Sequence, residues 1–165
     1  MPELILFRHA KSSWSIPELD DFDRPLSSRG MRDAPIMAER IKHIIQKDTL
    51  LMSSPANRAA STARAAARIW EYSLNAIQYA PELYQANELE IWKLIQQVPA
   101  TNQQLVLFGH NEGFSNFLQN CASNSELELP TAGVVWLSFE CNGWAAVAAS
   151  NSRIKLLDYP KKKMS

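Results

Sequence analysis

Two short stretches of the sequence each bring a histidine to the end of an apolar run. Residues 4–7 are followed by Arg8 and His9, and residues 105–108 are followed, after one glycine, by His110. A continuous apolar run of this length is typical of a strand that is buried on both faces of a parallel sheet. Ligands bind such sheets in the crevice outside the carboxyl ends of the strands. The sequence therefore predicts that His9 and His110 meet at an active-site edge.

Three arginines are expected beside the two histidines. Arg8 directly precedes His9, and Arg58 lies in the first turn of the helix expected after the second strand. Arg24 lies in a long loop, rich in Ser, Pro and Asp, that follows the first strand, and long loops in compact domains are often functional. The planar guanidinium group matches phosphoryl oxygens, and a helix N-terminus adds backbone donors. This set of side chains predicts a pocket for a dianion rather than for an apolar ligand.

The two histidines can take separate roles in phosphoryl transfer. One can attack phosphorus as a covalent nucleophile, and the other can donate hydrogen bonds to the phosphoryl oxygens. If the arginines supply the positive charge, the reaction needs no metal ion, and no ligand spacing typical of a metal site is found in the sequence. We therefore expect an enzyme that uses neither a metal nor another cofactor.

The elements that would position these residues alternate along the chain. We expect strands at residues 3–9, 49–52, 76–79 and 104–109, and helices from Ser27 or Ser28, at 56–70, at 88–98 and at 112–121. Ser54 is expected to cap the second helix, with Pro55 at its first position. Residues 134–139 and 144–148 are predicted to pair as a hairpin across Asn142-Gly143. This order is typical of a single domain, residues 1–165, with three α/β/α layers and a mostly parallel central sheet.

Length and composition are those of an ordinary globular domain without a bulk charge. The chain has 165 residues, of which 46% are apolar, and Lys plus Arg equal Asp plus Glu at 17 each. This balance gives no reason to expect nucleic acid or an anionic membrane as a partner. No segment has the length of a membrane span and the first residues lack the features of a signal peptide, so we expect a cytoplasmic protein.

These motifs together resemble the histidine phosphatase superfamily, and within it the small phosphohistidine phosphatases of the SixA type. The resemblance rests on Arg8-His9-Ala10-Lys11-Ser12-Ser13-Trp14, Asp23-Arg24-Pro25-Leu26, Ser54-Pro55 with Arg58 and Thr62, and Gly109-His110-Asn111. It implies a phosphoglycerate mutase-like fold and a phosphatase in which His9 is the phosphorylated nucleophile. It also implies that His110 completes a pocket in which three arginines bind the phosphoryl group: Arg8, Arg24 and Arg58.

The sequence departs from the superfamily pattern at two places. Ala10 stands where glycine is usual, which excludes only a markedly positive φ at that position. The segment between Arg58 and His110 leaves little room for the insert that carries a general acid in larger members, and three glutamates remain candidates: Glu82, Glu88 and Glu90. An alkoxide leaving group needs an acid far more than an imidazole does. Phosphohistidine in a partner protein, with its labile P–N bond, therefore fits better than a sugar phosphate.

Two other functions stay open. A small-molecule phosphomonoesterase on the same scaffold would act on a small phosphate ester, and it would need one of the three glutamates to reach the leaving oxygen. A non-catalytic phosphate-binding module would belong to a different class of protein. The presence of both histidines beside three arginines argues against that module.

Several nearby residues are given ordinary roles. His43 lies between two apolar helix positions and is expected at the surface. Trp14 lies in the long first loop and is a candidate wall of the pocket. The acidic side chains of that loop are expected to be solvated, with Asp23 orienting Arg24: Asp20, Asp21 and Asp23.

Overall fold

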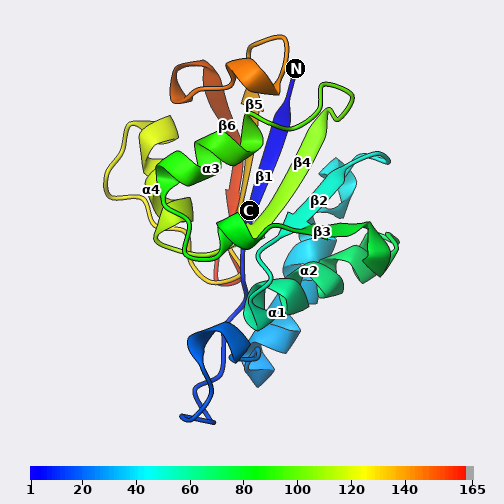
Figure 1. Cartoon of the computed structure of the whole chain (residues 1–165), viewed down its shortest axis with the longest axis vertical. Helices are drawn as coiled ribbons and strands as arrows, with labels where there is room; N and C mark the ends of the chain where they lie inside the picture. Colours follow the sequence, from blue (N-terminus) through cyan, green and yellow to red (C-terminus); the bar gives the residue numbers. More distant parts are fainter. Residues whose placement is uncertain (163–165) are drawn as a thin grey trace.

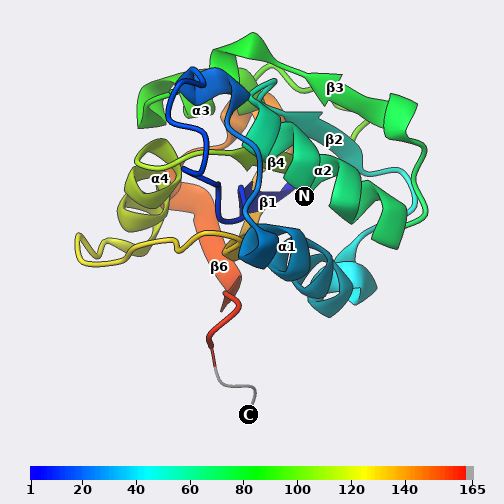
Figure 2. The same ribbon diagram turned by 90° about the horizontal axis from the view of Figure 1, so that it is seen from below.

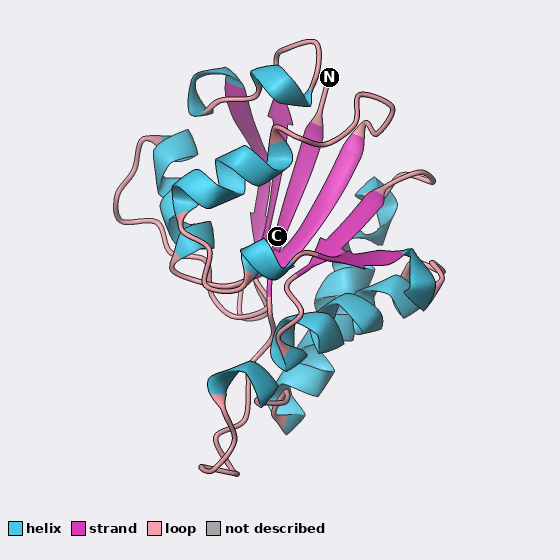
Figure 3. Cartoon of the chain, viewed as in Figure 1, coloured by secondary structure: helices cyan, strands magenta, loops and turns pink. Residues whose placement is uncertain are grey.

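The centre of the protein is a mixed six-stranded sheet (Figures 1 and 3). The computed structural model describes residues 1–162. In spatial order the strands are β3 (Ile77–Tyr79), β2 (Leu50–Ser53), β4 (Gln104–Gly109), β1 (Glu3–Arg8), β5 (Val134–Phe139) and β6 (Ser152–Asp158). The four strands from β3 to β1 in this order pair in parallel, whereas β5 pairs antiparallel with both of its neighbours, β1 and β6. The mostly parallel sheet predicted from the sequence is confirmed.

Helices cover both faces of this sheet and produce the predicted three layers (Figures 1 and 2). The helices α1 (Ser28–Ile41) and α2 (Asn57–Ile69) pack on one face, and α3 (Glu88–Ile95) and α4 (Gly113–Ala122) pack on the other. Side chains of β1 alternate between the two layers: Ile5 and Phe7 join the core under α1 and α2, while Leu4 and Leu6 join the core under α3 and α4. Burial on both faces explains why β1 is a continuous apolar run.

Strand register brings three carboxyl ends to the same edge. Arg8 lies opposite Gly109 and Ser53 lies opposite Phe108, so β1, β4 and β2 end at the same level. The chain continues this pairing just beyond the strands, where the His9 backbone N–H donates to the Gly109 carbonyl over 3.0 Å. The residues that follow each strand therefore start side by side, as the motif positions predict.

The predicted terminal hairpin is wrong in its second strand. Residues 144–148 do not form a strand; Trp144–Ala146 is a short 3-10 helix, and β6 is instead the partner of β5. Trp144 is buried and its indole N–H donates to the Asn102 carbonyl over 2.6 Å, which folds this segment across the end of the sheet. Gly143, with φ 164°, is extended rather than in a tight turn. Trp144 and Val147 are therefore buried although they are not part of a strand.

The helix beginnings are also informative. Ser27 is the N-cap of α1, because its hydroxyl accepts the Gly30 N–H over 3.1 Å. The predicted cap of α2 is wrong: this helix starts at Asn57 after Ala56, and Ser54 lies two positions earlier than a cap. No helix among residues 1–162 is long and apolar enough to span a membrane.

Candidate active site

His9 lies directly after β1 and is only 7% exposed. Its Nδ1 is 2.7 Å from the carbonyl oxygen of Ala10, an acceptor only, so we assign the ring proton to Nδ1. Burial, opposed in part by this hydrogen bond, lowers the pKa of His9 to about 3, and the ring is neutral at pH 7. Nε2 is thus left with an unprotonated lone pair, which is the requirement for a nucleophile.

The backbone after His9 accommodates alanine without strain. Ala10 is fully buried and does not adopt a positive φ. Its N–H donates to the Thr62 hydroxyl over 3.0 Å, and that hydroxyl donates to the Arg58 carbonyl over 2.8 Å. These two bonds tie the end of β1 to the first turns of α2. Thr62, quoted in the sequence motif without a role, therefore fixes the backbone next to His9.

His110 follows β4, and its ring centroid lies 5.2 Å from that of His9. Its Nε2 is 2.8 Å from the Ser54 hydroxyl. Because Ser54 already accepts the Ala56 N–H over 3.2 Å and is fully buried, its own proton is best donated to Nε2 of His110. We therefore assign the His110 proton to Nδ1.

His110 is left with a buried N–H that needs an acceptor. Its Nδ1 is one of three buried side-chain polar atoms that lack a hydrogen-bond partner within the described residues. Burial, together with the charge of Arg58, lowers the pKa of His110 to about 4, so the ring is neutral. An unpaired buried donor costs free energy of about 1–3 kcal/mol. A phosphoryl oxygen beside His9 would satisfy it.

The side chain of Arg8 also has a buried hydrogen-bond donor without an acceptor among the described residues. One terminal N–H donates to the Leu129 carbonyl over 2.7 Å, but the buried Nε lacks any partner in the part of the chain that the structure describes. The charge of Arg8 also contributes to lowering the pKa of both His9 and His110. Arg8 and His110 thus each have a buried nitrogen without a partner in the described part of the chain.

Arg24 and Arg58 are brought together by one carboxylate, that of Asp21. Arg24 donates to Asp21 Oδ1 over 3.0 Å, and Arg58 donates to Oδ2 over 2.9 Å and to the Asp21 carbonyl over 2.6 Å. Arg24 is further held by the Ser12 hydroxyl and, over 3.3 Å, by the Ser13 carbonyl. The arginine from the loop and the arginine from α2 therefore act as one cationic group.

Asp21 and Tyr84 are site residues that the sequence reasoning missed. Asp23 was the predicted partner of Arg24, but Asp21 takes that place, three residues away across a short 3-10 turn. The Tyr84 hydroxyl donates to Asp21 Oδ2 over 2.7 Å, and the Tyr84 ring packs edge-on against His110. Although partial burial acts to raise it, hydrogen bonds from Tyr84 and Arg58 lower the pKa of Asp21 to about 2.

The three candidate glutamates do not join this cluster. Glu90 accepts the Asn87 N–H over 3.1 Å in the capping box of α3, and Glu88 accepts the indole N–H of Trp92 over 3.0 Å. Glu82 lies exposed in the 3-10 turn before Tyr84. None of the three is hydrogen-bonded to a predicted site residue. Within residues 1–162, no group of three His, Cys, Asp or Glu side chains is placed to hold a metal ion.

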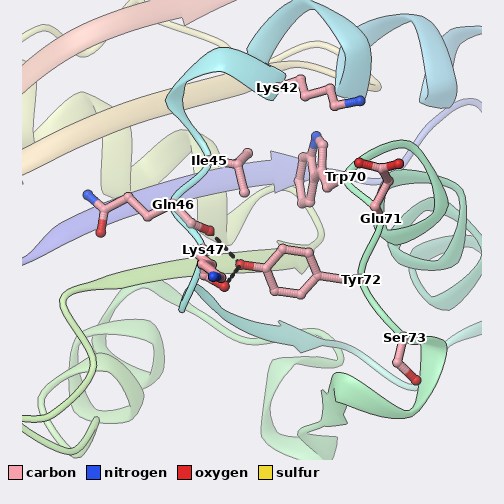
Figure 4. Close-up of a pocket in the computed structure, with 8 residues that line it drawn as sticks. All are labelled: Lys42, Ile45, Gln46, Lys47, Trp70, Glu71, Tyr72 and Ser73. Carbon is pink, nitrogen blue, oxygen red and sulfur yellow. Dashed lines mark hydrogen bonds between the residues drawn. The ribbon is translucent and has the colours of Figure 1, made fainter.

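A cavity of about 570 Å³ lies elsewhere (Figure 4). It is formed by the segments that precede β2 and β3, so it opens at the amino ends of these strands, opposite the histidines. Its wall is fixed by Tyr72, whose hydroxyl donates to the Gln46 carbonyl over 2.5 Å. The two histidines and the arginines lie instead at the carboxyl edge of the sheet. His43 is exposed, as predicted.

The comparison with known proteins agrees with this geometry. The family model described as histidine phosphatase superfamily (branch 1) matches residues 4–100. The uncharacterized chloroplastic protein At3g52155 of Arabidopsis thaliana is 27% identical over 149 residues, which cover 86% of this chain and 68% of that protein.

Two solved structures have the same fold. The SixA protein of Agrobacterium tumefaciens superposes with a TM-score of 0.79 and 26% identity, covering 96% of this chain and 98% of that one. A phosphoserine phosphatase of Entamoeba histolytica, solved with 3-phosphoglyceric acid, gives a TM-score of 0.69 at 15% identity, covering 98% of each chain.

Proposed function

Because this chain belongs to branch 1 of the histidine phosphatase superfamily and is a phosphatase, we propose that it hydrolyses phosphohistidine in a partner protein through a covalent intermediate on His9. The observation that carries the proposal is the juxtaposition of two buried histidine rings, whose centroids lie 5.2 Å apart. With the tautomers assigned above, His9 has an unprotonated Nε2 and His110 has a proton on Nδ1, which lacks a partner among the described residues. In this proposal residues 1–165 act as one catalytic domain.

The first step transfers the phosphoryl group to the enzyme. Its oxygens are bound by Arg8, Arg24 and Arg58, and Nδ1–H of His110 donates to one of them. The lone pair on Nε2 of His9 attacks phosphorus while the bond from phosphorus to the substrate imidazole breaks. The electron pair of that bond stays with the imidazole nitrogen, which takes a proton from solvent.

The second step hydrolyses the intermediate. A water molecule attacks phosphorus, the bond to His9 Nε2 breaks, and inorganic phosphate leaves with the oxygen of that water. In both steps the proton of His9 stays on Nδ1, which donates it to the Ala10 carbonyl. Positive charge at the reacting phosphoryl group comes from the three arginines, so the proposal includes no metal ion.

The choice of phosphohistidine as substrate is supported by the contacts of two candidate acids. Glu88 and Glu90 are held in the first turn of α3 by hydrogen bonds of their own, and a leaving imidazole needs less protonation than an alkoxide. The similarity to the SixA protein of Agrobacterium tumefaciens, which is described as a putative phosphohistidine phosphatase, supports the same choice.

A small-molecule phosphomonoesterase is the second candidate. The observation in its favour is Glu82, which is exposed two residues before Tyr84 and is not held by a hydrogen bond. If Glu82 reaches the leaving oxygen of a bound ester, it supplies the acid that an alkoxide requires. Glu82→Gln would then lower the rate on phosphomonoesters while the rate on phosphohistidine stays unchanged.

The proposal is tested with a histidine peptide carrying a ³²P-phosphoryl group. Rapid quenching of the wild-type protein should trap an alkali-stable, acid-labile label, and turnover of this peptide should exceed that of phosphoserine peptides. His9→Ala should remove the label and lower kcat at least about 1,000-fold. His43→Ala, a change of the exposed histidine, is the matched control and should behave as wild type. Activity of His9→Ala within tenfold of wild type would refute the nucleophile.

A further inference from the structure

We propose that the exposed side chains of the first loop form a docking surface for the protein segment that carries the phosphohistidine, and that this segment has apolar and basic residues beside it. We call this surface the loop rim and define it as Trp14, Ile16, Glu18, Asp20, Phe22 and Asp23. The inference rests on the proposed function and specifies its partner. Figure 1 shows the loop, in dark blue, extending away from the sheet beyond β1.

The apolar part of the loop rim is unusual for a surface loop. Trp14, Ile16 and Phe22 are 69%, 51% and 38% exposed, all within nine residues of sequence. Isolated exposed apolar side chains are common, but several large ones together on a surface indicate a site of protein interaction. Aromatic residues are also enriched among the side chains that contribute most to binding.

The loop rim adjoins the phosphoryl site directly. The Trp14 ring stacks on the guanidinium of Arg24, with 3.2 Å from the Arg24 Cζ to the ring centroid. Phe22 packs edge-on against Tyr84 at 5.1 Å, and Tyr84 packs against His110 at 5.6 Å. A phosphorylated side chain that reaches the arginines therefore brings its neighbours onto Trp14 and Phe22.

The loop rim is also fixed in place at its base. Ser12 pairs with Leu26 in an antiparallel bridge, and the Ser13 N–H donates to the Pro25 carbonyl over 2.8 Å. Because the loop is held by its own backbone as well as by Arg24, its apolar side chains are presented before a partner arrives. Such preorganisation lowers the entropic cost of binding.

The charge of the loop rim is opposite to that of the phosphoryl site. Glu18, Asp20 and Asp23 are exposed and none of them takes part in an ion pair with another of residues 1–162, whereas Asp21 is engaged by two arginines. A partner that presents a phosphoryl group with lysine or arginine nearby complements both regions at once. A small phosphate ester would contact the arginines and leave the loop rim uncovered.

The test compares two phosphohistidine peptides of equal length. One has leucine and arginine beside the phosphohistidine, and the other has serine and glycine. With wild-type protein we expect kcat/KM to be at least tenfold higher for the leucine/arginine peptide, through a lower KM. Ile16→Ser should reduce this ratio at least threefold. Ile36→Ser, which changes an isoleucine of α1 that is 49% exposed, is the matched control and should leave the ratio unchanged.

A third peptide tests the basic part of the proposal. Replacing arginine by glutamate should lower kcat/KM several-fold at low ionic strength, and the difference should shrink in about 0.5 M salt because exposed charges are screened. Equal rates for the arginine and glutamate peptides at low salt would overturn the basic requirement.

Other outcomes would overturn the docking surface as a whole. If wild type hydrolyses the leucine/arginine and serine/glycine peptides equally well, the loop rim does not dock the substrate, while the proposed phosphohistidine activity stands. If neither peptide is hydrolysed but phosphomonoesters are, the proposed function itself fails. If Ile16→Ser converts a dimer to a monomer on a sizing column without changing the peptide ratio, the loop rim binds a second copy of this chain instead.

Discussion

Replacing Ser54 by alanine tests the assignment of the His110 proton. The Ser54 hydroxyl lies 2.8 Å from Nε2 of His110, and if it donates to Nε2 the ring proton is on Nδ1. In the proposed mechanism this Nδ1–H donates to a phosphoryl oxygen. Without this hydroxyl, the neutral tautomer of His110 with its proton on Nδ1 loses the hydrogen bond that favours it. The alternative tautomer would present a lone pair, rather than a donor, to the phosphoryl oxygens.

The expected fall in kcat follows from the free energy of one buried hydrogen bond between neutral groups. Losing it and leaving a buried nitrogen unpaired costs about 1–3 kcal/mol, and 1–2 kcal/mol corresponds to about 5- to 30-fold in a population or a rate. We expect kcat of Ser54→Ala to fall about 5- to 30-fold on a phosphohistidine peptide, with KM nearly unchanged because the arginines remain. His110→Ala, which removes the donor itself, should cost about 100- to 1,000-fold.

Two measurements separate this role from a merely structural one. Long-range ¹H–¹⁵N NMR spectra of the His110 ring should show protonation at Nδ1 in wild type and a mixture of tautomers in Ser54→Ala. Ser54→Thr retains a hydroxyl and should restore both the tautomer and kcat. Ser53→Ala, which changes the preceding buried serine whose hydroxyl donates to a backbone carbonyl, is the control for loss of a buried hydroxyl. A kcat of Ser54→Ala within twofold of wild type, with His110 still protonated at Nδ1, would refute the reasoning.

Four further predictions concern the charges of the site. Arg24→Lys should lower kcat/KM about 10- to 100-fold in steady-state kinetics, since an ammonium group cannot replace the fork that contacts Asp21, Ser12 and Ser13; an unchanged value would move Arg24 out of the site. Activity should survive exhaustive dialysis against a chelator, and a loss that one particular metal restores would show that the arginines do not suffice. Because the pKa values of His9 and His110 lie at about 3 and about 4, kcat/KM should stay level between pH 7 and about pH 5, and a fall with an apparent pKa near 6.5 would contradict the neutral rings. The unfolded chain binds these protons near pH 6.5, before the folded chain does, so the free energy of unfolding in urea should decrease as the pH is lowered from 6.5 towards 4.

Strand ends and residue types were sufficient to predict where the two histidines lie. Strands β1 and β4 are buried on both faces, so each is an uninterrupted apolar run with an abrupt polar end, and this signal is local in sequence. The strand β6 was missed for the opposite reason. Its side chains alternate between half-buried and exposed, and its polar residues resemble a surface segment. Of the more apolar residues 144–148, Trp144 and Val147 are buried without pairing as a strand.

The partners of the site residues could not be read from the sequence in the same way. Asp21 and Asp23 are the same residue type in the same loop, and only the short 3-10 turn decides which carboxylate faces Arg24. Tyr84 contacts Asp21 across 63 positions of sequence, with no local pattern to connect them. Ser54 has the residue type of an N-cap, but α2 begins three residues later, which leaves its hydroxyl directed to His110.

Asp21 explains why a site with so many cations needs an internal carboxylate. The guanidinium groups of Arg8, Arg24 and Arg58 carry three positive charges, and Asp21, with a pKa of about 2, removes one of them at neutral pH. The charge of Glu128 also acts on Arg8, where it opposes the effect of burial on the pKa of the guanidinium, so Asp21 is not the only carboxylate that offsets the arginines. Burial keeps both histidines neutral. In the proposed mechanism, protonation of His9 would add a positive charge to this cluster and would also consume the lone pair on Nε2. The low pKa of His9 and the charge of its surroundings are therefore two consequences of the same buried arrangement.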